Sequence, residues 1–319
     1  MSLAPFTISA TATAVAVAYT QSDLVADLVL PRVPVDTQRF GYNVYNKEDG
    51  FTIPETEVGR KGKPAEVEFG SKELSDVTVD HGLDTPIPNA DVQNYEGARR
   101  NGNTRLVDPR LRATRALTQC LLTRREKRVA DLVTNVANYG VDNRIVLSGT
   151  SQWSDYTNSD PSRAIPDVLD SLFMRPTNLV MGRRVWSFLS RHPRICAAVF
   201  KNGTNNGLVT RAQFAELFEM SELPIIGEGW LNTAAKGQPV NMQRVWGNDM
   251  LAFHRDMNAD TEYGVTFGFT AEWGTRVAGS IVDPDMGIRG GERQRVGESV
   301  KELIIASDLA YLWKNAVTG

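Results

Sequence analysis

Apolar and polar residues alternate over a long stretch in the first quarter of the chain. The apolar positions fall two residues apart, which is the period of β-strands that bury one face. Between the last two alternating runs, segment 59–64 (GRKGKP) has the glycines and proline that are typical of a turn. The pattern therefore predicts a long β-hairpin, whose alternating residues are Tyr42 and Val44, Phe51 and Ile53, and Ala65, Val67 and Phe69.

The predicted hairpin is unusually polar for its length. Of the 34 residues from Lys47 to Asp80, 14 are charged, about 41%, against 23% for the whole chain. Two arms of about 20 residues would span roughly 65 Å, whereas a compact chain of 319 residues has a radius of gyration of about 20 Å. An isolated two-stranded hairpin is at best marginally stable in water. We therefore expect the hairpin to lie on the surface of other chains.

A period near 3.6 residues replaces this alternation after residue 106. Asp108 is a favourable N-cap, Pro109 stands at the first helical position, and no glycine or proline follows until Gly140. The pattern predicts one helix over residues 107–139, ended by Gly140. Thirty helical residues span roughly 45 Å, far more than the mean helix of about 11–12 residues. We interpret this helix as a structural strut.

The segments before this helix have weaker patterns. Residues 1–40 contain only short apolar runs, which Pro31 and Pro34 interrupt, so we predict an extended arm. Residues 81–103 are typical of a loop-like connection.

After the long helix, short helices and strands are mixed. The patterns predict helices at 162–173, 183–190 and 210–220, a buried strand at 177–181, and strands between glycine-rich turns from Leu223 onward. Residues 298–315 form a last apolar-rich strand pattern. No βαβ unit repeats, which favours an α+β fold.

Composition limits the function classes further. With 319 residues, 41% of them hydrophobic, the chain can bury a large core and form two domains. The net charge of −3 gives no global bias toward nucleic acid, and no run of 18 apolar residues occurs. The N-terminal segment lacks the basic start of a signal peptide. Cys120 and Cys196 lie in separate helical patterns and form no disulfide framework, which suits a reducing cytoplasm.

No constellation of residues indicates catalysis, a metal or a cofactor. The histidines are His81, His192 and His254, and no serine has a Gly-x-Ser-x-Gly surrounding. Neither glycine-rich segment, 227–229 or 287–291, matches a phosphate-binding motif. We interpret a possible carboxylate cluster as solvated turn residues, namely Asp249, Asp256, Asp260, Asp283 and Asp285. A soluble enzyme with an unrecognised site remains the alternative.

Positive charge gathers at the start of the long helix. From Arg99 to Arg128 there are ten basic and two acidic residues, which gives +8 over 30 residues. One reading is a solvated face that pairs with acidic residues elsewhere in the chain. The other is contact with nucleic acid, without sequence readout, or with an acidic loop of a neighbouring subunit. The candidate contact residues are Arg110, Arg112, Arg115, Arg124, Arg125, Lys127 and Arg128.

The order of these elements resembles the major capsid protein of tailed bacteriophages, which has the HK97-type fold. The resemblance extends over essentially the whole chain and rests on four segments. In their residue patterns, these segments are most similar to capsid subunits of Mu-like transposable siphophages. They are FTIPETEVGRKGKPAEVEFGSKELSDVTVDHGLDTPIP, DPRLRATRALTQCLLTRREKRVADLVTN, PTNLVMGRRVWSFLSRHPRI and VWGNDMLAFHRD.

The resemblance implies a division of the chain and a set of partners. Residues 1–40 would be the N-terminal arm and 41–80 the extended loop, or E-loop, both lying across neighbouring subunits. Residues 81–185, with a spine helix at 107–139, would form the peripheral domain, 186–284 the axial domain, and 285–319 a return to the peripheral domain. Such subunits form hexamers and pentamers in an icosahedral shell around double-stranded DNA, assembled in the host bacterial cytoplasm and retained in the virion.

Further partners follow from the same resemblance. The arm follows Met1 almost at once, where many relatives have a cleaved scaffolding segment, so we expect a separate scaffolding protein, besides a portal and decoration proteins. An encapsulin-like bacterial compartment of the same fold is the alternative within this family.

The E-loop supplies the expected contacts between subunits. Although Lys61, Lys63 and Lys72 are available, we expect salt bridges rather than covalent crosslinks. One exposed pair contributes about 0–1 kcal/mol, and repetition over the shell makes the sum large. The expected contact residues are Glu55, Glu57, Arg60, Lys61, Lys63, Glu66 and Glu68.

Overall fold

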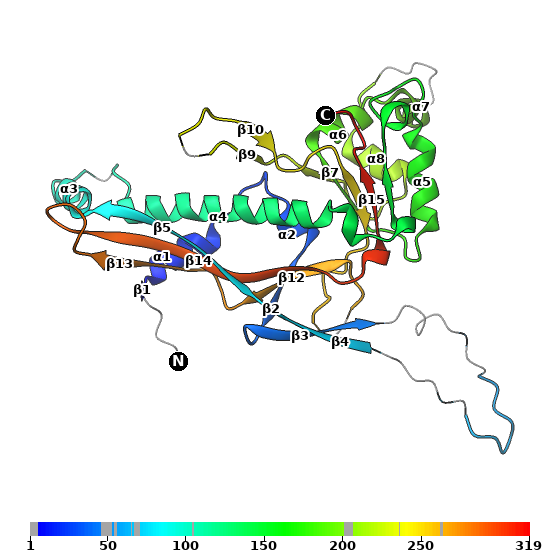
Figure 1. Ribbon diagram of the computed structural model, residues 1–319, viewed down its shortest axis with the longest axis horizontal. Coiled ribbons are helices and arrows are strands. Elements are labelled where there is room, and N and C mark those ends of the chain that lie inside the picture. Colours follow the sequence, from blue (N-terminus) through cyan, green and yellow to red (C-terminus); the bar gives the residue numbers. More distant parts are fainter. Residues whose placement is uncertain are drawn as a thin grey trace.

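The chain is elongated, with a sheet and a long helix at one end and a helix-covered sheet at the other (Figure 1). The computed structural model describes residues 6–45, 53, 56–64, 66, 71–103, 105–200, 207–235, 237–261 and 264–319. Helices and strands occur together without βαβ repeats, which confirms the predicted α+β class.

A six-stranded sheet forms the long part of the molecule. Its central strand β14 pairs antiparallel with β5, β12 and β13, while β1 pairs with β13 and the parallel strand β2 pairs with β12. The absence of a side chain at Gly279 allows β1 and β13 to lie close together, because a Cβ at this position would lie 2.1 Å from the Thr7 carbonyl oxygen. The strands are β1 (Thr7–Ile8), β2 (Arg32–Val35), β5 (Val79–Pro88), β12 (Gly268–Trp273), β13 (Val277–Asp283) and β14 (Gly291–Ile304).

A five-stranded sheet with the order β6-β15-β11-β7-β8 forms the second part. All residues of β7 and β11 are buried, which confirms the buried strand predicted at 177–181. A two-stranded hairpin, β9 (Trp230–Asn232) with β10 (Met242–Arg244), leaves this part and lies above the long helix in Figure 1. The five strands are β6 (Arg144–Val146), β7 (Asn178–Gly182), β8 (Ile225–Gly227), β11 (Met250–Phe253) and β15 (Ala310–Lys314).

Four helices cover the five-stranded sheet. Three were predicted, and the capping box at Thr210 confirms the predicted start of the third. The additional helix α7 begins at Pro193, where the sequence suggested an end, because proline is tolerated at the first helical position. The four are α5 (Pro161–Ser171), α6 (Arg183–Leu189), α7 (Pro193–Phe200) and α8 (Arg211–Leu217).

The long helix α4 (Pro109–Val133) has 25 residues, about 38 Å at 1.5 Å per residue. Its start agrees with the prediction, since the Asp108 carboxylate accepts the N–H of Arg110 at 2.9 Å. The predicted end at residue 139 is wrong. The Tyr139 hydroxyl donates to the carbonyl of Val133 at 2.6 Å and closes the helix end, and a separate turn, η1 (Val136–Asn138), follows. The other short 3₁₀ turns are η2 (Val141–Asn143), η3 (Gly149–Ser151) and η4 (Ser307–Leu309).

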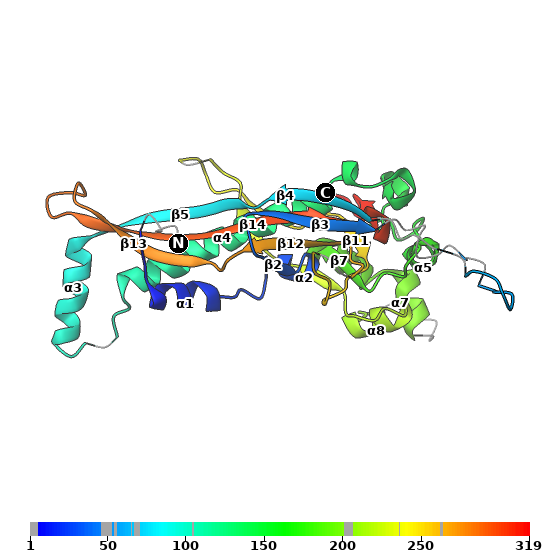
Figure 2. The same cartoon turned by 90° about the horizontal axis from the view of Figure 1, so that it is seen from below.

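Residues 81–103 do not form the loop-like connection that we predicted. Strand β5 pairs with β14 over ten residues, and helix α3 (Asn89–Arg100) lies at the end of the sheet (Figure 2). In α3 only Val92 is buried, so the apolar period that indicates a helix is missing from its sequence.

The extended arm predicted for residues 1–40 is also wrong for most of its length. Ser9 caps helix α1 (Ala10–Ala18), whose buried Ala12 and Ala16 pack against Leu117 and Leu121 of α4. Alanine lets the two helices approach closely, and the short helix α2 (Ala26–Val29) follows. We call residues 6–35 the N-terminal segment, which docks on its own chain.

The predicted ribbon is confirmed where it leaves the body. Strands β3 (Arg39–Tyr45) and β4 (Ser71–Val77) pair antiparallel, and the N–H of Gly62 donates to the carbonyl of Gly59 at 2.7 Å in the predicted turn. Most of the predicted outer strands lie outside the described residues, at Phe51, Ala65, Val67 and Phe69.

The predicted domain boundaries do not follow the sheets. Strands β12 and β13, placed in the axial domain by the resemblance, lie in the six-stranded sheet, whereas β15 lies in the five-stranded sheet beside β11. The chain crosses between the two sheets repeatedly, so each sheet contains strands from several separate ranges of the chain.

Candidate assembly surfaces

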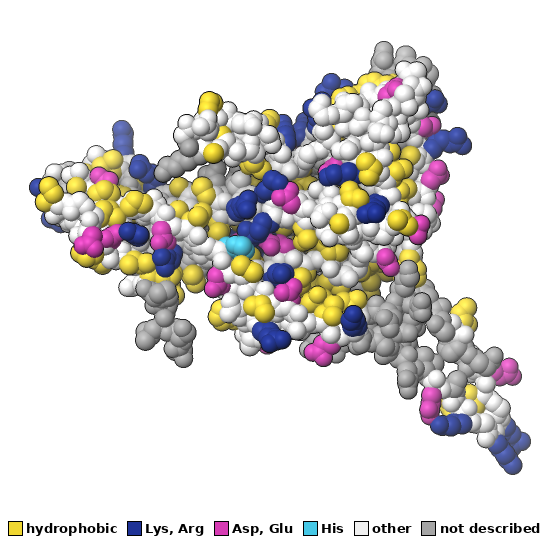
Figure 3. All heavy atoms as spheres, in the orientation of Figure 1, with side chains coloured by type: hydrophobic (Ala, Val, Ile, Leu, Met, Phe, Trp, Pro, Cys, Tyr) yellow, Lys and Arg dark blue, Asp and Glu magenta, His cyan; other side chains and the backbone are white. Residues whose placement is uncertain are grey.

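The tip of the E-loop points away from the rest of the chain (Figure 1). Arg60 and Lys61 are the central residues of its turn and are exposed, and Figure 3 shows their region as a group of basic side chains. Lys63 pairs with Glu66. The described loop residue Ile53 is 95% exposed. Of the other predicted contact residues, Glu57 is exposed, and Glu55 and Glu68 lie outside the described residues.

The basic face of α4 is divided between paired and exposed residues. Arg110 pairs with Glu292, Lys127 with Asp131, and Arg128 with Glu302, whose Nη2 and Oε1 atoms lie 2.8 Å apart. For these three residues, the structure agrees with the interpretation that the basic face pairs with acidic residues of the same chain. The exposed members of the predicted set are Arg112, Arg115 and Arg124.

Arg125 does not belong to this face and is the clearest correction among the predicted contact residues. Its residue exposure is 1%. The guanidinium donates to Asp27 at 2.6 Å and to the Thr270 hydroxyl at 3.0 Å. It also approaches the carbonyl of Leu30 at 3.5 Å. Arg125 therefore joins α4, the N-terminal segment and β12 within one chain, and its charge faces neither a neighbour nor DNA.

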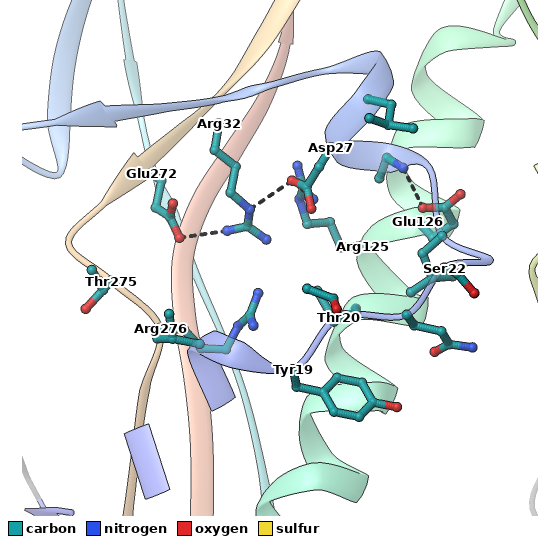
Figure 4. Close-up of a pocket in the computed structure, with 16 residues that line it drawn as sticks. Tyr19, Thr20, Ser22, Asp27, Arg32, Arg125, Glu126, Glu272, Thr275 and Arg276 are labelled. Carbon is teal, nitrogen blue, oxygen red and sulfur yellow. Dashed lines mark hydrogen bonds and ion pairs between the residues drawn. The ribbon is translucent and has the colours of Figure 1, made fainter. Parts of the chain in front are cut away.

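A cavity of about 480 Å³ lies where the N-terminal segment crosses α4 and the β12–β13 turn. Figure 4 shows the Arg32 side chain between Glu272 and Asp27, with N–O distances of 2.7 and 2.9 Å. Arg276 donates to the carbonyl of Ala16 at 2.6 Å, which fixes the α1 end. These ion pairs and hydrogen bonds hold the N-terminal segment, which lines the cavity, against α4 and β12, while Arg32 Nη2 and Arg125 Nε remain buried without a hydrogen-bond partner.

In this network, opposite charges favour each other's ionised state. Burial opposes the charged state of Arg32, but the carboxylates of Glu298, Asp27 and Glu272 raise its pKa. Burial likewise opposes ionisation of Glu298, yet Arg32 and Arg276 hold its pKa below the ordinary value. Arg32 and Glu298 are therefore both charged at neutral pH.

Glu126 anchors the same segment from the neighbouring position on α4. It is fully buried, and its carboxylate accepts the N–H groups of Val25, at 3.0 Å, and Ala26, at 2.7 Å. The Trp246 indole N–H also donates to it. Burial raises the pKa of Glu126 above its ordinary value, and the donated hydrogen bonds oppose that shift. The carboxylate thus satisfies the free N–H groups at the start of α2.

This docking network was not predicted from the sequence. A signal was present, because Arg125 and Glu126 lie three and four residues from the apolar positions Leu122 and Val129, on the core-facing side of the helix. A charged pair on an apolar helix face indicates buried partners. The partner residues lie on distant segments, and the sequence around them contains no pattern that predicts this pairing.

The geometry around His192 argues against a catalytic serine. Its Nε2 lies 3.1 Å from the Ser159 hydroxyl, and its Nδ1 accepts the N–H of Arg194 at 3.3 Å. Because Nδ1 accepts, Nε2 carries the proton and donates to Ser159, so the imidazole cannot act as its base. Burial lowers the pKa of His192 to about 4.

The remaining candidates give no further site. Within the described part of the chain, no group of three His, Cys, Asp or Glu side chains could hold a metal ion. None of the described helices is long and apolar enough to cross a membrane. Cys120 is exposed and Cys196 is buried, and both are free thiols.

Comparisons with known proteins found relatives over the whole length of the chain. Residues 12–228 match the family described as Phage major capsid protein E. A major capsid protein of Pseudomonas phage JBD67 is 48% identical over 319 residues, 99% of both chains. A major capsid protein of Burkholderia phage BcepMu is 23% identical over 309 residues, 94% of both chains. A solved phage-related protein from Bordetella bronchiseptica RB50 is 20% identical, with a TM-score of 0.72 over 98% of this chain and 99% of that chain.

Proposed function

The chain belongs to the family of phage major capsid proteins and has the HK97-type capsid fold, and from this membership we propose that it assembles as hexamers and pentamers into an icosahedral shell around double-stranded DNA. Its place is the virion, after assembly in the host bacterial cytoplasm. The role is structural, without catalysis.

One observation carries the proposal, namely that the loop tip projects away from the rest of its own chain. The described tip residues are exposed, and the loop leaves the molecule through the two-stranded ribbon of β3 and β4 (Figure 1). A ribbon of this kind gains stability only against another surface. In a protein of this family that surface is another copy. The loop therefore supplies contacts between copies, whereas the N-terminal segment docks on its own chain.

The loop contacts are ionic and repeated. The proposed contact residues remain Glu55, Glu57, Arg60, Lys61, Lys63, Glu66 and Glu68. On α4, the exposed Arg112, Arg115 and Arg124 remain for contact with a neighbour or with packaged DNA. A separate scaffolding protein and a portal are further proposed partners.

Electron microscopy of the protein purified from phage-infected cells, where the proposed scaffolding protein is present, tests the proposal. We expect closed particles tens of nanometres wide, and only monomer-sized material in sedimentation would refute it. Nuclease treatment of particles from phage-infected cells distinguishes the encapsulin-like alternative, because a phage head protects double-stranded DNA and a protein compartment protects cargo protein. Both curated relatives are phage proteins, which favours the phage head.

A further inference from the structure

The two large sheets share no strand pair, so their relative orientation depends on what lies between them. Within the described residues, no strand of the six-stranded sheet pairs with a strand of the five-stranded sheet. Backbone connections join the sheets, such as residues 305–309 between β14 and β15. A backbone connection alone can act as a hinge. Packing and hydrogen bonds at the junction must therefore hold the sheets at one angle.

The part of the N-terminal segment around α2 occupies this junction. Figure 1 shows α2 beside α4, close to where the long helix reaches the five-stranded sheet. We call residues 25–31 the wedge. Its side chains Val29 and Leu30 are at most 1% exposed and belong to one core cluster with Val129 of α4 and Leu251 of β11. The wedge is therefore packed against the long helix and the five-stranded sheet at once.

The last residues of the wedge are held by the six-stranded sheet. The N–H of Thr270, on β12, donates to the carbonyl of Pro31 at 2.8 Å. The hydroxyl of Thr270 donates to the carbonyl of Leu30 at 3.1 Å. Directly after the wedge, the chain continues as β2, which pairs with β12. This end of the wedge is thus fixed by the edge of the sheet.

The earlier residues of the wedge are held from the five-stranded sheet by Arg255, which follows β11. The Arg255 side chain is 6% exposed, and its Nη1 donates to the carbonyl of Leu28. Its Nη2 lies 2.5 Å from the Glu222 carboxylate, which also accepts the amide of the buried Asn178, on β7, at 2.7 Å. Because α2 has only four residues, the Leu28 carbonyl is one that the helix leaves free, and the guanidinium satisfies it.

A second contact ties the same residues to the five-stranded sheet through α4. The Glu126 carboxylate, which accepts the N–H of Ala26, also accepts the indole N–H of Trp246. Trp246 lies directly against β8, where a Cβ at Gly227 would be 2.0 Å from the indole ring. Long helix, wedge and five-stranded sheet therefore meet at one buried carboxylate.

We propose that Arg255 is a positioning residue for assembly, because its hold on the Leu28 carbonyl keeps the wedge in place and fixes the angle between the two sheets. This inference rests on the proposed function. In a shell built from one kind of subunit, contacts close only if each subunit presents its surfaces at a fitting angle. A loosened wedge lets packed elements slide, so the curvature varies from subunit to subunit.

Distances between two spin labels test the angle in unassembled subunits. One label is attached to Cys120, exposed on α4, and the other to an exposed α5 position through Asp167→Cys, while the buried Cys196 is protected from the label. We expect one narrow distance distribution with Arg255 present. The distribution should be about two-fold broader in Arg255→Gln, because release of the wedge permits sliding at the junction. An unchanged distribution in Arg255→Gln would overturn the proposal.

Particle diameters test the consequence for the shell. Particles are purified from cells infected with phage that carries each variant and are measured by electron microscopy. We expect Arg255→Gln to broaden the distribution of diameters by about two-fold or more, since contacts at a variable angle do not close uniformly. A uniform population of unchanged diameter would overturn the role in assembly. Absence of closed particles from the unmodified chain would instead refute the proposed function, and the spin-label distances would still decide whether Arg255 fixes the angle.

Two further variants separate positioning from a general loss of charge. Arg211→Gln, at an exposed position at the start of α8, is the matched control and should leave both distributions unchanged. Arg255→Lys keeps the charge beside Glu222 but replaces the two guanidinium arms by one ammonium, so we expect partial broadening. Equal broadening in Arg211→Gln would contradict the positioning role.

Circular dichroism of unassembled subunits checks that each variant is folded. Should Arg255→Gln fail to fold, Arg255→Lys carries the same test, because the retained charge still pairs with Glu222. Distance and diameter distributions in Arg255→Lys that equal those of the unmodified chain would then contradict the inference.

Discussion

The carboxylate of Glu126 accepts the backbone N–H of Ala26 at 2.7 Å, although 100 residues separate the two in sequence. This hydrogen bond fixes the start of α2 to the middle of α4. It shows why residues 6–35 do not form a free arm, because their polar backbone groups find partners inside the same chain.

Replacing Glu126 should therefore release the N-terminal segment. In Glu126→Ala, the N–H groups of Val25 and Ala26 and the Trp246 indole lose their acceptor, and buried donors left without a partner cost about 1–3 kcal/mol. Amide hydrogen exchange should become faster at residues 24–30, with a lower urea midpoint. Glu96→Ala, on exposed helix α3, is the control and should leave both unchanged. Unaltered exchange in Glu126→Ala would contradict the anchoring role.

Two adjacent arginines should differ sharply in their effect on stability. Arg125→Met removes a buried guanidinium with charged partners, and the expected loss is about 1.5–3 kcal/mol in the free energy of unfolding. Arg124→Met changes an exposed residue and should stay within about 0.5 kcal/mol. Urea unfolding followed by tryptophan fluorescence measures both. Similar losses in the two variants would mean that the burial of Arg125 is not maintained in solution.

The helix contact of α1 depends on the small size of its buried alanines. Ala16 is fully buried beside α4, so Ala16→Leu should force the helices apart, with an expected cost of about 1–3 kcal/mol. Ala14 is exposed on the same helix, and Ala14→Leu provides an identical change in composition. Limited proteolysis should cut the segment before residue 35 faster in the first variant alone. Equal cutting would show that α1 is not docked.

We expect the free energy of unfolding to decrease below neutral pH because His192 is buried in its neutral form. Burial lowers its pKa from 6.5 to about 4, so the unfolded chain binds a proton between these values that the folded chain excludes. The free energy of unfolding therefore decreases as the pH falls from about 6.5 to 4.

Urea midpoints at pH 7 and pH 4.5 measure this dependence. His192→Gln should weaken it, whereas His254→Gln, at a partly exposed position, should retain it. A wild-type pH dependence in His192→Gln would assign the effect to other groups.

Deleting the loop from Glu55 to Glu68 should separate folding from assembly. The described residues of this stretch contribute no buried side chain, so the subunit should remain folded and soluble. It should fail to form closed shells, because the surface between copies is lost. Sedimentation and electron microscopy measure the outcome, and normal shells from the shortened chain would refute the role of the loop.

Several features of the fold followed from local chemistry. The N-cap at Asp108, the buried strand β7 and the glycine turn of the loop depend on residues within a few positions of each other, and each was predicted. Helix α3 was missed because nearly all of its face is exposed, which leaves no apolar period to detect. The end of α4 was misplaced because a tyrosine six residues away closes it.

The sequence by itself determined the strut helix, the polar ribbon and the absence of a recognisable catalytic motif, since these depend on residue type and short spacing. Only the tertiary structure decided which charges remain on the surface. Arg124 and Arg125 are identical side chains one position apart, and the 100° turn between them sends one to solvent and the other to Asp27. The partner of a buried charge lies on a distant segment, and only folding brings that segment near.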